Sequence, residues 1–173
     1  MTESSLSDKD REKARQAALR KLSVRDRTEK EILDFLKEAG CTGAEAEEIT
    51  SEFREWGYID DEKYCRRYFE YGRSKGKASA RIIKELVQKG ISAEKARDVL
   101  EELTDRTADD REAALSVGMK MALNQTDLGK DIDDRFLARV GRRLAGLGYD
   151  SSTCYYGIGK VRDYGKERER EDE

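Results

Sequence analysis

The residues of this chain whose types and spacing best suit a binding role are two rows of basic side chains at helical spacing. Lys77, Arg81 and Lys84 stand at positions i, i+4 and i+7, which places them on one face of a helix. Cations in such a row can neutralise phosphate or carboxylate groups of a partner, and such contacts fix position without reading a base sequence. The same spacing recurs in a second row of Arg135, Arg139 and Arg142.

Charge is segregated along the chain. The net charge is only -3, yet the stretch from Lys63 to Arg97 holds eleven Lys and Arg against three Glu. The stretches just before and just after it are acidic. An ordinary solvated helix face is the plainer interpretation of a basic row. The chain repeats one helical pattern, described below, and the two basic rows occupy equivalent positions of that pattern. This recurrence favours a surface for an anionic or acidic partner.

We assign eleven residues to this predicted surface. They are Arg66, Arg67, Arg73, Lys75, Lys77, Arg81, Lys84, Arg135, Arg139, Arg142 and Arg143. Aromatic residues near these cations could stack on single-stranded bases, but Tyr64, Tyr68 and Phe69 follow an apolar helix stripe and fit a core better. Tyr58 and Tyr71 remain open between the two interpretations.

Several classes of chemistry find no support in the composition. The chain has no His, the commonest general base and metal ligand, and its three Cys are far apart without a C-x-x-C pair. The acidic run Asp60, Asp61 and Glu62 is explained by a helix start more simply than by a metal site. Phosphate-binding loops and nucleophile elbows are missing from the sequence. We therefore expect no enzyme activity, no cofactor and no metal.

One helical pattern, written three times about 50 residues apart, must position the basic rows. Each copy ends at a glycine that suits a helix C-terminus, with an aliphatic residue eight positions and a leucine four positions earlier. The glycines are Gly40, Gly90 and Gly148. Thr28 with Glu31 and Thr42 with Glu45 form capping boxes that begin helices. Repeats of this length indicate stacked helical units.

The boundaries follow from this period. We predict a disordered start at 1–10, three-helix repeats at 11–59, 60–104 and 105–164, and a charged tail that frays at 165–173. Gly72 and Gly76 are expected to bracket a turn, and the glycines of the third repeat, Gly157 among them, to weaken its helices. No apolar run approaches a membrane span, and the N-terminus lacks an apolar signal region. We expect a cytoplasmic monomer.

Two stretches of this chain resemble the RecX family of bacterial recombination regulators. Trp56-GYIDDEKYCRRYFEYGRSKGKASARIIKELVQKGI is similar to the family pattern of G-x-I/L-D-D opening a helix, followed by K-G-x-x-R-I-x-x-E-L-x-x-K-G-I. Arg25-DRTEKEILDFLKEAG is similar to R-x-R-S/T-x-x-E-L-x-x-x-L-x-x-K/G-G. Together these stretches cover about 80 residues; the rest of the chain matches in architecture more than in letters.

The resemblance implies an all-α fold of three tandem three-helix repeats, forming an elongated, curved, right-handed array without enzyme activity. It also implies binding to the recombinase RecA, in the groove of its DNA filament, with restraint of strand exchange and ATP hydrolysis or promotion of filament loss. Single- and double-stranded DNA are possible partners. The acidic first repeat and the pI near 5.4 favour recombinase contact over binding to bare DNA. A non-sequence-specific DNA-binding protein and a generic helical adaptor remain the alternatives.

Overall fold

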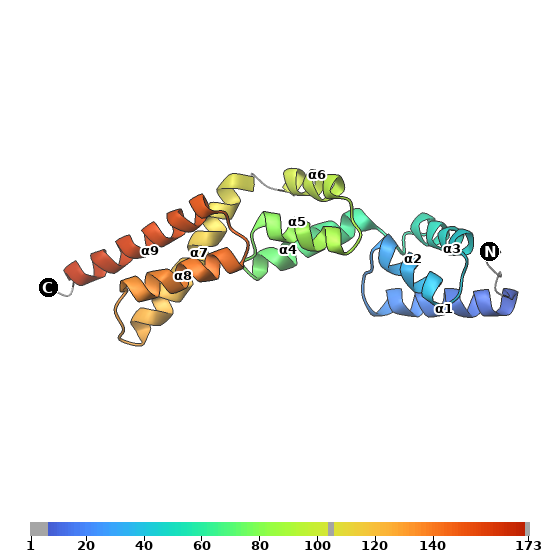
Figure 1. The fold of residues 1–173 in the computed structure, drawn as a ribbon, viewed down its shortest axis with the longest axis horizontal. Helices are drawn as coiled ribbons and strands as arrows, with labels where there is room; N and C mark the ends of the chain where they lie inside the picture. The colour runs from blue at the N-terminus through green and yellow to red at the C-terminus, as the bar shows by residue number, and fades with distance from the viewer. Residues whose placement is uncertain (1–6, 104–105, 172–173) are drawn as a thin grey trace. The chain divides into compact units, whose positions relative to one another are not determined.

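In the computed structural model, residues 7–103 and 106–171 are described, and this part of the chain is made of α-helices without strands (Figure 1). The predicted all-α class is confirmed. No helix among these residues is long and apolar enough to cross a bilayer. The helices are α1 (Asp8–Val24), α2 (Glu29–Glu38), α3 (Gly43–Glu55), α4 (Asp61–Ser74), α5 (Ser79–Gln88), α6 (Ala93–Leu103), α7 (Arg106–Asp127), α8 (Asp134–Gly146) and α9 (Ser151–Glu171).

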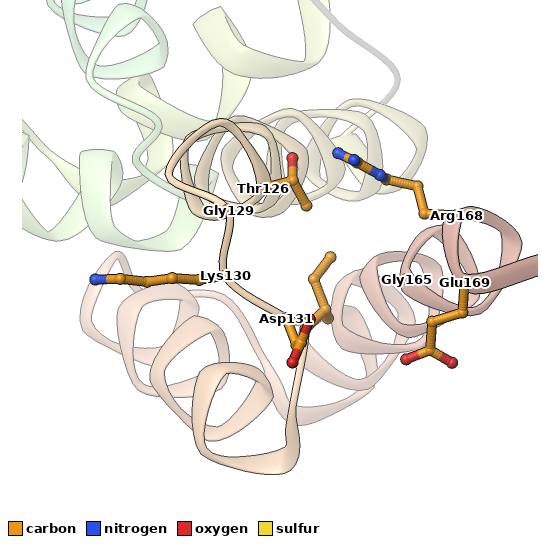
Figure 2. A pocket seen from close by; sticks show the side chains of 8 residues that line it. Thr126, Gly129, Lys130, Asp131, Gly165, Arg168 and Glu169 are labelled. Atoms are coloured by element: carbon orange, nitrogen blue, oxygen red, sulfur yellow. The ribbon is translucent and has the colours of Figure 1, made fainter. Parts of the chain in front are cut away.

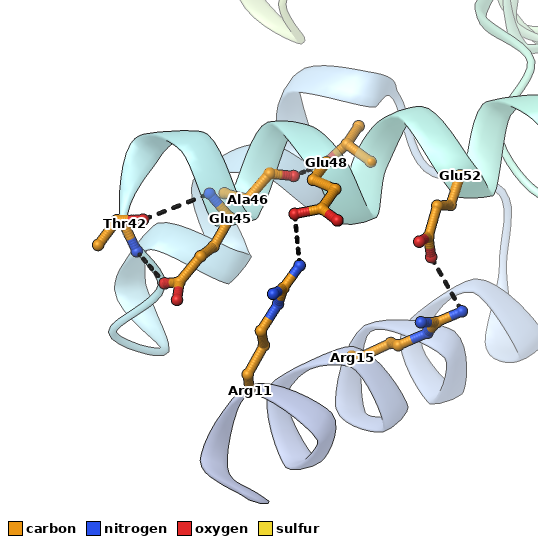
Figure 3. Close-up of polar contacts among 8 residues, drawn as sticks. Arg11, Arg15, Thr42, Glu45, Ala46, Glu48 and Glu52 are labelled. Atoms are coloured by element: carbon orange, nitrogen blue, oxygen red, sulfur yellow. Dashed lines mark hydrogen bonds and ion pairs between the residues drawn. The ribbon is translucent and has the colours of Figure 1, made fainter. Parts of the chain in front are cut away.

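Side-chain caps begin the first three helices. The hydroxyls of Thr28 and Thr42 accept the backbone N–H groups of Glu31 and Glu45, whose carboxylates accept the N–H groups of the two threonines in return. Both predicted capping boxes are therefore confirmed, and Figure 3 shows the second of them. Ser7 caps α1 in a similar way. The helix thus covers part of the region predicted to be disordered, of which residues 1–6 lie outside the described chain.

The three repeat glycines end α2, α5 and α8 as predicted. Gly40, Gly90 and Gly148 have φ values of 97°, 91° and 93°, a backbone conformation that residues with a Cβ rarely adopt. The residue after each glycine donates its N–H to the carbonyl five residues earlier, as in Tyr149 to Leu144 at 3.3 Å. This bond satisfies a carbonyl that the helix end would leave without a donor.

Other glycines act differently from the prediction. Gly72 lies buried inside α4 rather than in a turn, and a Cβ built there would come 2.6 Å from Cγ1 of Ile82. Gly157 lies inside α9, where a Cβ would come 2.9 Å from Cδ1 of Leu144. These glycines permit close helix packing rather than simply weakening helices. The chain at 165–171 also continues α9, where a frayed tail was predicted.

Internal contacts divide the chain into two compact units. Unit 1 holds the residues up to Arg67 together with Glu85–Val99, and unit 2 holds Tyr68–Lys84 together with Leu100–Glu173. The divisions fall inside α4, α5 and α6, the helices of the middle sequence repeat. Sequence repeats and contact units are therefore different partitions of this chain.

The core of unit 1 lies among α1, α2 and α3. Its buried members are Ala14, Ala18, Ile32, Leu36, Cys41, Ala46, Ile49, Phe53 and Ile59. Two ion pairs at the edge of this core join α1 to α3, Arg11 with Glu48 at 2.6 Å and Arg15 with Glu52 at 2.9 Å (Figure 3). The small alanines of α1 allow it to pack closely on α2 and α3.

Unit 1 also contains a junction between repeats, which we call the first junction. It joins the start of α2, at Thr28 and Lys30, to Lys89 and Gly90 at the end of α5. The buried hydroxyl of Thr28 donates to the carbonyl of Lys89 at 2.7 Å. Gly90 lies so near Lys30 that a Cβ there would come 2.4 Å from the Cβ of Lys30. The Lys89 ammonium lies 4.0 Å from the Glu31 carboxylate.

The core of unit 2 lies among α7, α8 and α9. Its buried members include Ala114, Ala122, Phe136, Leu137, Val140, Leu144, Cys154 and Val161. Gly118 of α7 is buried, and a Cβ there would come 2.9 Å from Cγ2 of Val161 on α9. This close approach explains how the long helices α7 and α9 pack along one another (Figure 1).

Unit 2 contains an equivalent junction, the second junction. It joins the start of α5, from Gly76 to Arg81, to the turn 146–149 after α8. The Ala78 N–H donates to the Leu147 carbonyl at 3.0 Å, and the buried Tyr149 hydroxyl donates to the Gly76 carbonyl at 2.9 Å. A Cβ on Gly148 would come 2.7 Å from the Cβ of Arg81. Burial raises the pKa of Tyr149 to about 12, so its hydroxyl remains a donor at neutral pH.

Candidate interaction surface on the second unit

The last turn of α4 carries an exposed aromatic ring, with lysines beside it in the turn that follows. Tyr71 is 54% exposed, so it belongs to the surface and not to the core. The Lys75 ammonium lies 5.6 Å from the centroid of this ring, and the Lys77 ammonium lies 6.0 Å from it. Tyr68, which is half-buried, lies beside it with ring centroids 6.3 Å apart. Cations and an aromatic face are thus gathered at one end of α4.

Arg81, in the middle of the predicted α5 row, helps to hold the second junction. Its guanidinium donates to the Gly146 carbonyl at the end of α8, a position where a cation also complements the helix dipole. The side chain remains largely exposed. Lys84 follows it on α5 and is exposed too. One member of the row therefore has a structural contact, while Lys84 faces solvent.

Arg73 is directed into unit 2 rather than toward solvent. Its side chain is 20% exposed and pairs with the Asp110 carboxylate at 2.5 Å and the Ser79 hydroxyl at 2.7 Å. Asp110 also accepts the Ser79 N–H at 3.1 Å and the Ser79 hydroxyl at 2.9 Å. This network fixes the start of α5 against α7. Sequence reasoning placed Arg73 on the binding surface, and its contacts instead give it a structural role.

The basic residues of α8 are exposed. Arg135 and Arg142 face solvent at the spacing that the sequence indicates. Arg139 is also exposed, donates to Oε1 of Gln125 at 2.8 Å, and lies 4.9 Å from the centroid of the Phe136 ring. Arg143 is exposed as well. All four belong to unit 2, as do Lys75, Lys77, Arg81 and Lys84.

Arg66 and Arg67 belong to unit 1. Arg66 pairs with Glu62 one turn earlier on α4, at 2.9 Å, and the exposed Arg67 pairs with Asp26. Exposed pairs of this kind contribute little to stability. They also neutralise part of the charge that the sequence assigned to the binding surface. The net positive charge around Arg66 and Arg67 is therefore lower than the run of basic residues in the sequence suggests.

A pocket of about 400 Å³ opens between the α4–α5 turn, α7 and α8. Its cationic lining residues are Arg73 of α4, Lys75 of the following turn, Lys120 of α7 and Arg143 of α8. Ser116 and Asn124 are neutral polar groups in the lining. Val117, Met121 and Ala113 supply apolar surface. Sequence reasoning missed Lys120. No local pattern marks it, because its place in the pocket depends on residues from other elements.

A second pocket of about 190 Å³ in unit 2 has a different character (Figure 2). It lies between the α7–α8 connection and the last turns of α9, and carries both signs of charge: Lys130 and Arg168 against Asp131 and Glu169. In Figure 2 the Lys130 side chain extends away from Asp131. A mixed lining has no preference for an anion, so the first pocket is the better anion site of the two.

Comparison with known proteins matches two consecutive segments of this chain to known domains. Residues 14–52 match the first three-helix domain of RecX, and residues 60–100 match the second. A 95-residue region is 35% identical to the regulatory protein RecX of Salmonella paratyphi A and 34% identical to that of Escherichia coli. It covers 49% of this chain and 57% of each relative, so the match spans little more than half of their length.

Solved structures extend the likeness in fold to most of the chain. The crystal structure of RecX from Lactobacillus salivarius has a TM-score of 0.73 at 24% identity, covering 90% of this chain and 99% of that one. A second crystal structure of a regulatory protein RecX has a TM-score of 0.67 at 26% identity, covering 91% of this chain and 79% of that one. The two matched domains, the named relatives and the shared fold agree, and the chain belongs to the RecX family.

Proposed function

We propose that this protein binds the RecA filament and restrains the recombinase, lying along the filament groove and limiting strand exchange, ATP hydrolysis or filament extension. The family is one of regulatory proteins and not an enzyme class, which supports action by binding. We place this role in the cytoplasm, with the protein acting as a monomer.

The observation that carries the proposal is the basic surface of unit 2. It comprises Lys75, Lys77, Arg81, Lys84, Arg135, Arg139, Arg142 and Arg143, of which all but the half-buried Lys77 are exposed. A filament presents both DNA phosphates and protein carboxylates, and this set of cations can meet either. Arg66 and Arg67 belong to unit 1, and we propose them as separate binding residues that exchange their pairing with Glu62 and Asp26 for the partner on binding. We leave out Arg73 because its guanidinium holds unit 2 together.

The test is the ATPase activity of RecA on single-stranded DNA, titrated with this protein at two salt concentrations. Inhibition well below one molecule per RecA subunit, weakening at higher salt, is the expected result. No inhibition at either salt by a folded helical protein would refute the proposal.

A charge-reversal variant assigns the inhibition to the surface. Changing Lys84, Arg135 and Arg142 to Glu alters side chains that are exposed and leaves the Arg81 contact in place. Inhibition is expected to fall by at least tenfold in potency. The matched control carries the same charge change on α9, at the exposed Lys160, Arg162 and Lys166, and should inhibit like the parent. Equal loss in the two variants would show that only net charge matters.

Direct binding to DNA is the second candidate function, because the same cations can neutralise phosphates without RecA. It predicts micromolar binding to bare DNA. If about five of these groups meet phosphates of a duplex, the slope of log affinity against log salt is about -4 to -5. A generic helical adaptor would show neither DNA binding nor an effect on RecA, so the two assays together separate the three functions.

A further inference from the structure

We propose that Tyr71 and the neighbouring cationic pocket form a seat for one nucleotide of single-stranded nucleic acid. The base would stack on the Tyr71 ring, and the adjacent phosphate would lie among Lys75, Lys120 and Arg143. This inference rests on the proposed function, because Lys75 and Arg143 belong to the same basic surface and the inference names single-stranded nucleic acid as their ligand. It adds an aromatic contact and α7, neither of which belongs to the basic rows.

Lys75 connects the two parts of the seat. Its ammonium lies 5.6 Å from the Tyr71 ring centroid, and its side chain also lines the pocket that Lys120 and Arg143 share. Tyr71 is 54% exposed, so a planar ligand can reach its ring. An exposed cation–π contact is weaker than stacking of a base on an aromatic ring. A base could therefore displace a lysine from the ring, and the freed ammonium would be within reach of the phosphate.

The combination of groups selects among anionic ligands. In a duplex the base faces are stacked on one another, so an exposed ring has nothing to stack on unless the strands separate. A free phosphate would use the pocket and leave the ring unused. A single strand offers a flat base face next to a phosphate, which is the pairing used by proteins that bind single strands without sequence preference.

Binding of a fluorescein-labelled 15-residue oligothymidylate to the 173-residue chain, measured by anisotropy at two salt concentrations, tests the proposed site. Tyr71→Ala should weaken binding about 5- to 100-fold, while Tyr71→Phe should bind like the parent because it keeps the ring. The matched control is Tyr155→Ala, since Tyr155 also lies in unit 2 and is 75% exposed; it should leave binding unchanged. Melting curves confirm that each variant is folded.

An abasic oligonucleotide of equal length separates stacking from charge. It keeps the phosphates and removes the bases, so the parent and Tyr71→Ala should bind it equally. Changing Lys120 and Arg143 to Gln should reduce the salt slope by about 1 to 1.5 on both oligonucleotides. Equal binding of the parent and Tyr71→Ala to oligothymidylate would overturn the inference, as would an equal loss on the abasic strand. Stronger competition by an acidic peptide than by unlabelled oligothymidylate would also overturn it.

These outcomes are distinct from failure of the proposed function. Tyrosine-dependent binding to oligothymidylate without any effect on the RecA ATPase would refute RecA regulation and keep the nucleotide seat. Inhibition of RecA by a protein whose binding to single strands does not depend on Tyr71 would do the reverse.

Discussion

The first and second junctions each contain a hydrogen bond to a backbone carbonyl at the end of a helix, but the donor groups differ. Thr28 and Ala78 occupy the same repeat position, as do Lys89 and Leu147. In unit 1 the donor is the Thr28 side chain, whereas in unit 2 it is the Ala78 backbone N–H. In both, a glycine of positive φ lies against the side-chain stem of a cation, Lys30 or Arg81.

The surroundings of the two junctions differ in charge. At the first, Glu29 donates its N–H to Asp61 and accepts from Arg54, and Glu31 lies by Lys89, so cations are paired with acids. At the second, Arg81 bonds a backbone carbonyl instead of a carboxylate. The three bonds that join the start of α5 to the turn after α8 all end on backbone carbonyls, so they bring no carboxylate to the exposed cations of α5 and α8. This difference is consistent with the placement of the candidate surface on unit 2.

The largest expected effect comes from placing a side chain on the junction glycines. Gly90→Ala and Gly148→Ala each combine a positive φ with contact against a neighbouring Cβ, and each should lower the free energy of unfolding by about 3 kcal/mol. Urea denaturation measures it. The controls are Gly43→Ala and Gly146→Ala, where a Cβ meets nothing within 4 Å; they should be neutral or slightly stabilising. A harmless substitution at one junction glycine would show that this junction is not closed.

The Arg73 network of unit 2 should matter more than the exposed pair of Arg67 in unit 1. Arg73→Met leaves the Asp110 carboxylate, 20% exposed, with only its Ser79 donors, and should cost about 2 kcal/mol. Arg67→Met removes an exposed pair with Asp26 and should cost less than about 1 kcal/mol. Thermal melts of both variants give the comparison. Similar melting temperatures would contradict the structural role of Arg73.

The first junction should respond to loss of the Thr28 hydroxyl. Thr28→Val removes both the helix cap and the bond to the Lys89 carbonyl, for an expected loss of about 2 kcal/mol. Thr42→Val removes the equivalent capping box of α3 and should cost about 1 kcal/mol. The difference isolates the junction bond. If the two variants unfold at the same urea concentration, the Thr28–Lys89 bond contributes nothing.

The smallest effect is a pH dependence confined to alkaline conditions. Burial raises the pKa of Tyr149 to about 12 from 10.0. Since the folded pKa lies above the unfolded one, the stabilisation is complete below pH 10 and is lost as the pH rises toward 12. The equivalent residue at the first junction is Ile91, which cannot titrate. Tyr149→Phe should therefore lose less melting temperature between pH 9 and pH 11 than the parent.

The buried Cys65 supplies a background for that measurement. Burial raises its pKa to about 11 from 9.0, so it destabilises the folded chain from about pH 9 upward with the same sign. Burial also raises the pKa values of Tyr64, Cys41 and Cys154, so Tyr149→Phe should keep these contributions and lose only the one that belongs to Tyr149. Identical pH profiles for the parent and the variant would show that the Tyr149 hydroxyl is not buried against Gly76.

Sequence reasoning succeeded where a local rule decides the structure. The capping boxes at Thr28 and Thr42 and the helix ends at Gly40, Gly90 and Gly148 each depend on a few consecutive residues. Their spacing was enough to predict the helical class. The exposure of Lys84, Arg135 and Arg142 likewise follows from the face of a single helix.

It failed where the partner comes from another part of the chain. The direction of Arg73 depends on Asp110, and Gly72 is close to Ile82 on the next helix. The pocket needs Lys120 from α7 beside Lys75, a proximity that no local pattern contains. The charged end of α9 is helical to Glu171 rather than frayed, because Lys, Arg and Glu are strong helix formers despite their polarity.

The division of the middle repeat has a consequence for how the chain can be cut. The chain passes from one unit to the other three times, after Arg67, after Lys84 and after Val99. A single break in one of these passages leaves two intact peptide connections between the units. A protease nick there would appear on a denaturing gel without releasing either unit in solution, so the nicked protein would remain one particle.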